Sequence, residues 1–280
     1  MDRSPGQSSR WLACSRALLG LIALGWELSC AAPIRASDAS PRGHTFELEV
    51  GGGLYQLRDE GVAPLRWAGP AGQLGLRYVH AGRRARHQAG LRVPVAFLSN
   101  RYEHGGLGWE FGLGYQYLHR LGSARRAGPG GAFYLGAGYG FRLAVQELDW
   151  DVSHYQYLNA HELDAAVRWE RPLGDHAIFV QASAALIALV GRPPAQRHYD
   201  ETLAHYQFTE SHENLVFTGP HEYPSITVEL GYLIPLGRRW RLGTSYRLDS
   251  RNYFGERPIR ILDQTLVLCV AYSPWMGAHR

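Results

Sequence analysis

The sequence predicts an all-β protein, an antiparallel up-and-down transmembrane β-barrel of about ten strands, with eight or twelve strands as the alternatives. Three observations carry this prediction. Large apolar side chains occupy every second position over long stretches, compact connections alternate with longer ones, and the N-terminus has the layout of an export signal. The stretch Leu107–Tyr117 shows the alternation most clearly, because its odd positions are large and apolar and its even positions are Gly, Glu or Gln.

The N-terminal segment carries three arginines, then an apolar run, then small residues, which is the order found in secretory signal peptides. We expect cleavage after Ala31 or Ala36. Only Cys269 of the three cysteines then remains in the mature chain, so no internal disulfide is expected. The expected organisation is a signal peptide at 1–36, a short polar lead at 37–44, the transmembrane barrel at 45–273 and a C-terminal tail at 274–280.

Ten segments follow the two-residue period, and each is predicted to form one strand. The connections after the second, fourth, sixth and eighth segments are compact and rich in Gly and Arg, whereas the others are mostly longer and more polar. An antiparallel meander places the two kinds of connection at opposite ends, as in outer-membrane barrels. In chain order the segments are Phe46–Leu54, Leu74–Tyr78, Ala89–Phe97, Leu107–Tyr117, Phe133–Val145, Leu163–Trp169, Ile178–Val190, Ile226–Ile234, Trp240–Leu248 and Leu262–Tyr272.

The direction of the apolar face decides between a soluble barrel and a membrane barrel, since alternation alone fits both. Aromatic residues gather at the compact-turn end of the apolar stripes, as expected for a girdle at a membrane interface. A soluble core would scatter them. The predicted girdle consists of Phe46, Tyr78, Tyr115, Tyr117, Phe133, Trp169, Tyr232, Trp240 and Tyr272.

The other face of the strands combines glycines with charges of both signs. Glycines would weaken a strand that faced water, whereas in a crowded lumen they make room for opposite charges to pair. Because a barrel of this size is nearly filled by its own side chains, we expect a largely plugged lumen. The predicted lumenal charge network consists of Glu47, Glu49, Arg77, Arg92, Glu110, Arg142, Glu162, Asp164, Arg168, Glu229, Arg241, Arg247 and Asp263.

Taken together, these features resemble bacterial outer-membrane β-barrel proteins, in the class of the small OmpA-like and related transmembrane barrels. The resemblance implies an outer-membrane location, outer-membrane lipid and the barrel-assembly machinery as partners, and a monomer. One feature departs from the class, whose chains usually end on an aromatic residue. Here Tyr272 is followed by eight more residues, so either Tyr272 or Trp275 would serve as the assembly signal.

The expected function is that of a non-catalytic outer-membrane barrel with a structural, restricted-transport or surface-binding role. One alternative is an outer-membrane hydrolase acting on lipid or peptide, because Ser-His and Asp-His groups occur in the longer connections. A second alternative is a soluble exported ligand-binding barrel. The residues behind the hydrolase alternative are Asp149, Asp151, Ser153, His154, Ser211 and His212.

Several other classes are disfavoured. The net charge of +4 and the pI near 9.0 suggest nucleic-acid binding, but the arginines are scattered and no aromatic-basic platform is present. The long connection 191–222 carries His and carboxylate residues at irregular spacing, which predicts a solvated loop better than a metal site. No cofactor or metal is expected.

Overall fold

A computed structural model describes residues 43–60, 63–122, 131–149, 153–192, 197–198, 214–255 and 257–274. Within these ranges every regular element is a strand, and no helix could span a membrane. The strands are β1 (Gly43–Asp59), β2 (Ala63–Ala81), β3 (Ala85–Ser99), β4 (Gly105–Leu121), β5 (Ala132–Asp149), β6 (Ser153–Leu173), β7 (His176–Gly191), β8 (Arg197–His198), β9 (Leu215–Thr218), β10 (Ser225–Pro235), β11 (Trp240–Tyr253) and β12 (Ile259–Tyr272).

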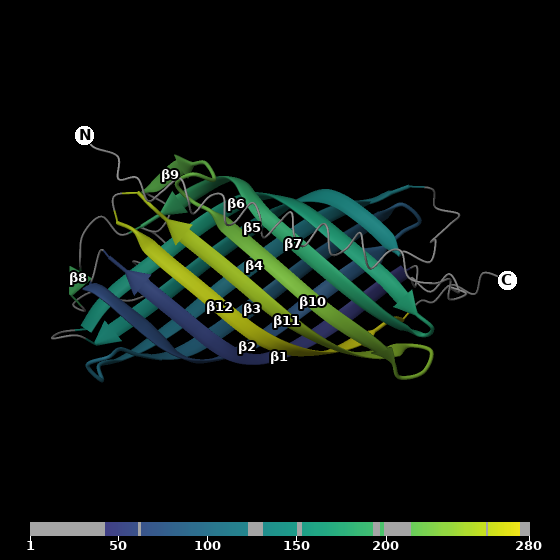
Figure 1. Cartoon of the computed structure of the whole chain (residues 1–280), viewed down its shortest axis with the longest axis horizontal. Coiled ribbons are helices and arrows are strands. Elements are labelled where there is room, and N and C mark those ends of the chain that lie inside the picture. The colour runs from purple at the N-terminus through teal and green to yellow at the C-terminus, as the bar shows by residue number, and fades with distance from the viewer. Residues whose placement is uncertain are drawn as a thin grey trace.

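The ten long strands form a closed antiparallel barrel (Figure 1). Each pairs with its neighbour in sequence, β7 pairs with β10, and β1 closes the ring against β12 from Phe46↔Tyr272 to Asp59↔Ile259. The short strands β8 and β9 extend the wall beside β6 and β7 at the left end of the view. Closure removes the free sheet edges, and the predicted all-β barrel of about ten strands is confirmed.

The four connections predicted to be compact all lie at one end of the barrel, but the one between β4 and β5 is ten residues long. There β2 and β3 are joined by three residues, β6 and β7 by two, and β10 and β11 by four. At the other end, the prediction of mostly longer loops is wrong. The β1–β2, β3–β4, β5–β6 and β11–β12 connections are three to five residues long, and only the β7–β10 connection is long.

Strands such as β1 are longer than predicted because their pattern of outward apolar residues inverts toward the loop end. Up to Leu54, strand β1 places apolar side chains outside, and beyond it the apolar residues Tyr55 and Leu57 are buried inside while Arg58 faces outward. The strands continue past the apolar belt because their backbone groups still pair across the ladder. A search for outward apolar stripes therefore ends each strand too early. Strand β1 also begins two residues before the predicted barrel start at 45.

The outer surface carries a continuous apolar belt. Leu48 on β1, Leu74 on β2 and Leu268 on β12 are each more than half exposed. On β4 the outward residues from Leu107 to Tyr117 cover ten residue steps, which at roughly 3.3 Å per step and a tilt of roughly 40° span about 25 Å of height. That height matches the apolar band of an outer-membrane barrel.

Candidate functional site: the charge-filled lumen

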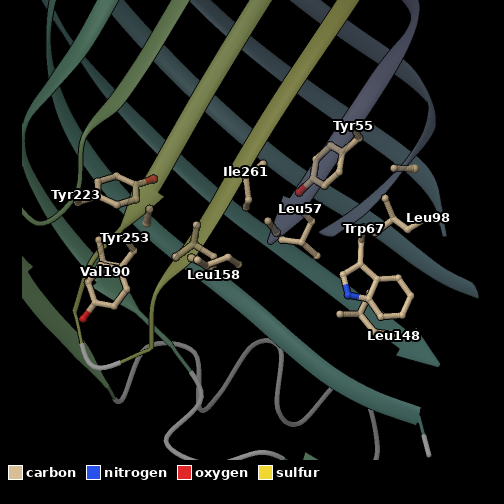
Figure 2. Packing of buried hydrophobic residues seen from close by; sticks show 14 of the residues in the cluster. Tyr55, Leu57, Trp67, Leu98, Leu148, Leu158, Val190, Tyr223, Tyr253 and Ile261 are labelled. Carbon is tan, nitrogen blue, oxygen red and sulfur yellow. The ribbon is translucent and has the colours of Figure 1, made fainter. Parts of the chain in front are cut away.

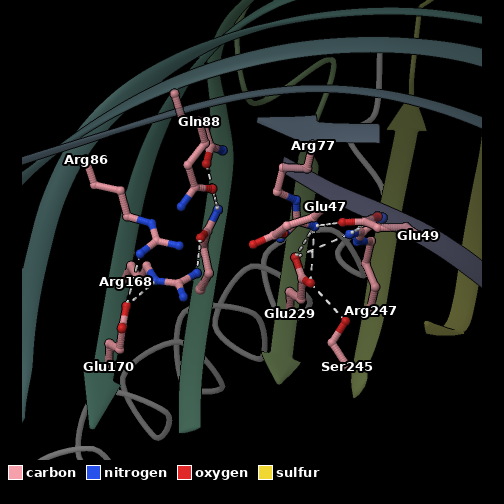
Figure 3. Close-up of polar contacts among 12 residues, drawn as sticks. Glu47, Glu49, Arg77, Arg86, Gln88, Arg168, Glu170, Glu229, Ser245 and Arg247 are labelled. Carbon is pink, nitrogen blue, oxygen red and sulfur yellow. Dashed lines mark hydrogen bonds and ion pairs between the residues drawn. The ribbon is translucent and has the colours of Figure 1, made fainter. Parts of the chain in front are cut away.

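The first lumenal charge cluster braces opposite parts of the wall near the compact-turn end (Figure 3). Arg77 on β2 lies 2.6 Å from Glu49 on β1, 3.2 Å from Glu229 on β10 and 3.7 Å from Glu47. Arg247 on β11 lies 3.1 Å from the same Glu49 and 3.4 Å from the same Glu229. Each guanidinium therefore bridges carboxylates from different strands across the lumen.

The second cluster lies nearer the loop end and is more deeply buried. Arg251 on β11 is 1% exposed and lies 2.6 Å from Glu110 on β4 and 3.3 Å from Asp249. Asp249 is also paired with Arg92 at 2.5 Å and with Arg142. Buried ion pairs of this kind roughly offset their own desolvation, so their main effect is to fix which strands face each other rather than to add net stability.

Glu162 on β6 extends this cluster toward the loop end. It lies 3.3 Å from Arg142 and accepts hydrogen bonds from Tyr223 at 2.7 Å and Ser225 at 3.2 Å. Burial and the neighbouring carboxylate raise the pKa of the Tyr223 phenol well above its usual value, so the phenol keeps its proton and acts as the donor. Tyr223 lies just before β10, and its hydrogen bond to Glu162 holds the end of the β7–β10 connection inside the barrel.

A third group closes the compact-turn side with amides and one stacked arginine. Arg168 on β6 lies 3.2 Å from Glu170, donates to Gln181 at 2.8 Å and stacks over Phe179 at 4.0 Å from the ring centroid. Gln181 in turn donates to Gln116 on β4 at 2.6 Å. Figure 3 shows this group beside the first cluster. The amides and the guanidinium therefore hydrogen-bond one another across the lumen.

An apolar plug fills the loop end of the lumen (Figure 2). Trp67 on β2, Leu148 on β5 and Ile261 on β12 are each at most 1% exposed, and Tyr55 and Leu158 pack with them. Their strands surround the barrel, so the plug is built from inward side chains of the wall itself. The sequence reasoning missed this plug, because it interpreted inward positions as polar throughout.

An ion pair spans the mouth above the plug. Arg192, just after β7, contacts both carboxylate oxygens of Asp59 at 2.7 and 2.9 Å and donates to the Tyr157 carbonyl at 3.2 Å. Strands β1 and β7 are separated by three strands on one side of the ring and by five on the other. The pair therefore ties nearly opposite walls together.

A polar cavity of about 160 Å³ lies between these groups. Inward glycines on β3, β4 and β5 leave this space, and side chains of both charge clusters and the amide group border it. It is large enough to hold several waters. Asp164 on β6 also lines it, 8% exposed and with Oδ1 lacking a hydrogen-bond partner in the described structure.

The structure places the predicted charges as follows. Ten of them join ion pairs inside the lumen, Asp263 is buried and accepts a bond from Thr265 at 2.7 Å, and Asp164 and Arg241 form no ion pair within the described ranges. The sequence reasoning missed six paired charges. All six lie at inward positions that follow the same alternation, beyond the ends of the apolar stripes or next to the turns. They are Asp59, Arg86, Glu170, Arg192, Asp249 and Arg251.

The nine predicted girdle aromatics all occupy outward positions near the compact-turn end. The tilted rings of Phe46 and Tyr78 have centroids 5.3 Å apart, and those of Trp240 and Tyr272 have centroids 4.6 Å apart. Phe46 and Trp240 are about half exposed, at 53% and 48%. Half-exposed aromatics at one height suit a boundary between hydrocarbon and water.

The residues of the hydrolase and metal alternatives fall mostly outside the described ranges, including Asp151, Ser211 and His212. Asp149 ends β5, and Ser153 and His154 are consecutive at the start of β6. Among the described residues, no group of three or more His, Cys, Asp or Glu side chains is placed to hold a metal ion.

Comparison with known proteins supports the fold. No protein-family model and no curated protein matches the sequence. The outer membrane protease OmpT from Escherichia coli is similar in structure, with a TM-score of 0.52, 8% identity, and coverage of 85% of this chain and 99% of that chain.

Weaker likenesses are to two transport domains. The translocator domain of autotransporter NalP from Neisseria meningitidis has a TM-score of 0.44, 12% identity, and coverage of 95% of this chain and 97% of that chain. The transport unit of AIDA-I from Escherichia coli has a TM-score of 0.42, 9% identity, and coverage of 89% and 97%. The chain therefore has the fold of outer-membrane β-barrels, and these low identities transfer no activity to it.

Proposed function

We propose that this chain is an integral outer-membrane barrel with a closed lumen, which acts as a membrane-embedded structural or binding unit rather than as an open pore. One observation carries the proposal: the outer face is an exposed apolar belt, while the inner face is filled by ion pairs and an apolar plug. An exposed belt of this extent would be insoluble in water and is stable in lipid.

The arrangement of the two faces argues against a soluble ligand-binding barrel. Such a barrel keeps apolar side chains inside around a ligand cavity. Here the cavity inside the lumen is polar and about 160 Å³, and the belt leucines Leu74 and Leu266 are 61% and 57% exposed outward. The surface for a binding role is then the loop end or the lipid-facing wall, since the lumen is occupied.

Membrane fractionation and gel mobility test this proposal together. The full chain, expressed with its N-terminal segment in a Gram-negative host, is expected in the outer-membrane fraction after an alkaline wash. It is also expected to migrate faster unheated than heated on a detergent gel, because a closed barrel resists unfolding. Recovery in the soluble periplasm without detergent, or a single band regardless of heating, would contradict the proposal.

A further inference from the structure

Three histidines form a row across the outer surface at the compact-turn end. The register places His44 on β1 opposite His80 on β2, His80 opposite His87 on β3, and His87 opposite Tyr117 on β4. The ring centroids are 4.6, 5.9 and 5.2 Å apart along this row. All four side chains share the outward parity of the belt, so they lie where the wall leaves the hydrocarbon.

Tyrosines of the adjacent girdle row hold two of these imidazoles in place. The Tyr78 hydroxyl lies 2.6 Å from Nδ1 of His44, and the Tyr115 hydroxyl lies 2.8 Å from Nδ1 of His87. A phenol that donates to Nδ1 leaves the imidazole proton on Nε2. In that tautomer the Nε2 N–H is a donor suited to a phosphate oxygen.

The charge around the row is of one sign. Arg83 and Arg84 form the exposed turn between β2 and β3, directly beyond His80 and His87, and His119 follows on β4. The rim segments 43–46, 78–89 and 115–122 contain no Asp or Glu. Such a surface is complementary to an anion at the membrane boundary.

An apolar hollow of about 660 Å³ lies immediately on the belt side of the row. In the girdle row, Ala89 stands between Tyr78 and Tyr115, and its methyl group leaves a gap between the two rings. Leu76 and Leu91 line the hollow on the belt side, and it continues past Phe46 to Tyr272 on β12 and Trp240 on β11. An apolar hollow next to a basic rim matches the two parts of a phospholipid.

We propose that this corner of the barrel, over β1 to β4, binds one anionic phospholipid from the leaflet at the compact-turn end. Its acyl chain lies over Ala89 between Tyr78 and Tyr115, and its phosphate lies at His80 and His87 below the Arg83–Arg84 turn. The inference rests on the proposed membrane location, since a soluble barrel would meet no such leaflet. It assigns the histidine row a binding role beyond that of a general interface girdle.

Lipid retention by the folded full-length barrel tests the site. The detergent-purified barrel is incubated with equal amounts of phosphatidylglycerol and phosphatidylcholine, and the lipid that stays bound is measured by native mass spectrometry. We expect phosphatidylglycerol to be preferred. The double variant Arg83→Ser, Arg84→Ser should lower that preference by about fivefold per arginine. Ala89→Phe should lower retention of both lipids because it fills the hollow.

A matched control is available at the loop end, away from the hollow. The side chains of Arg58 on β1 and Arg260 on β12 are 36% and 39% exposed there, so their double Ser variant removes the same charge far from the histidine row. It should leave the preference within about twofold of the wild type. His80→Asn with His87→Asn should weaken retention, whereas His176→Asn, whose Nδ1 lies 3.0 Å from Tyr232, should not.

Three results would overturn the site. Equal loss in both arginine variants would show general surface attraction, and no preference in a heat-shifted, folded wild type would remove the site while leaving the membrane proposal intact. Lipid retention that appears only after residues 275–280 are deleted would assign the hollow to the chain's own C-terminus. A barrel that fails to enter vesicles at all would instead overturn the proposed function.

Discussion

The ion pair across the mouth offers the sharpest energetic test of the lumen. Asp59 is 0% exposed and Arg192 is 6% exposed, and one guanidinium nitrogen of Arg192 lies 2.7 and 2.9 Å from the two carboxylate oxygens of Asp59. Arg192→Leu leaves the Asp59 carboxylate buried beside the apolar plug without its guanidinium. Removing one partner of a buried pair typically costs about 3–5 kcal/mol, because the remaining charge stays desolvated.

The double variant separates the pair from its surroundings. Asp59→Leu with Arg192→Leu leaves no buried charge unpaired and extends the neighbouring apolar plug. Its free energy of unfolding should therefore lie within about 1 kcal/mol of that of the wild type. The assay is guanidinium unfolding of the barrel in phosphocholine vesicles, followed by tryptophan fluorescence. With a slope of roughly 4 kcal/mol per molar, the single variant should lower the midpoint by about 1 M.

The adjacent surface pair is the matched control. Arg58 lies 3.3 Å from Glu60, and both side chains are about one-third exposed. Arg58→Ala should cost less than about 1 kcal/mol, since solvent screens exposed pairs. The reasoning is refuted if Arg192→Leu is as mild as Arg58→Ala, or if the double variant costs the sum of its two single changes.

Three further predictions probe the wall. In Gly231→Ala the new Cβ would lie 2.3 Å from the Phe179 ring, so this variant should destabilise the barrel by about 1–3 kcal/mol in the same unfolding assay. Gly72→Ala, which has open space around the new Cβ, should cost less than half of that. Leu74→Arg on the belt should cost about 2–4 kcal/mol in vesicles, and a cost near zero would mean that this face does not meet lipid. Cys269 borders a space of only about 10 Å³. In a background without the other two cysteines, its thiol should therefore react with a bulky maleimide only after unfolding, and rapid labelling of the folded barrel would show a more open lumen.

Several features of the fold follow from local sequence. The outward stripes predicted the position and direction of each strand within the belt, because lipid requires apolar side chains at every outward position there. Three of the four compact turns followed from their Gly and Arg content, and the β4–β5 connection is longer than predicted. Beyond the belt this requirement disappears, and β1 changes from outward leucines to the inward Tyr55 and Leu57. The strands continue without the pattern that revealed them.

The lumen was harder to predict than the wall. Parity shows that Asp164, Arg241 and Arg247 all face inward, but pairing depends on height and on which strands lie across the barrel. Arg247 pairs with Glu49, which lies near the other end of the sequence. Arg241 lies nearer the compact-turn end of the barrel and forms no ion pair in the described structure. Strand tilt and register fix these heights, and a single sequence does not reveal either of them.

Single-channel recording in a planar bilayer tests the central claim most directly. The purified, heat-shifted wild-type barrel should insert without producing conductance steps, because two charge clusters and the apolar plug fill its lumen. Disruption of both clusters by Arg77→Ser with Arg251→Ser should then produce openings in those molecules that still fold. Stable, ion-selective steps from the wild type, at a frequency that scales with the protein added, would contradict the closed-lumen account.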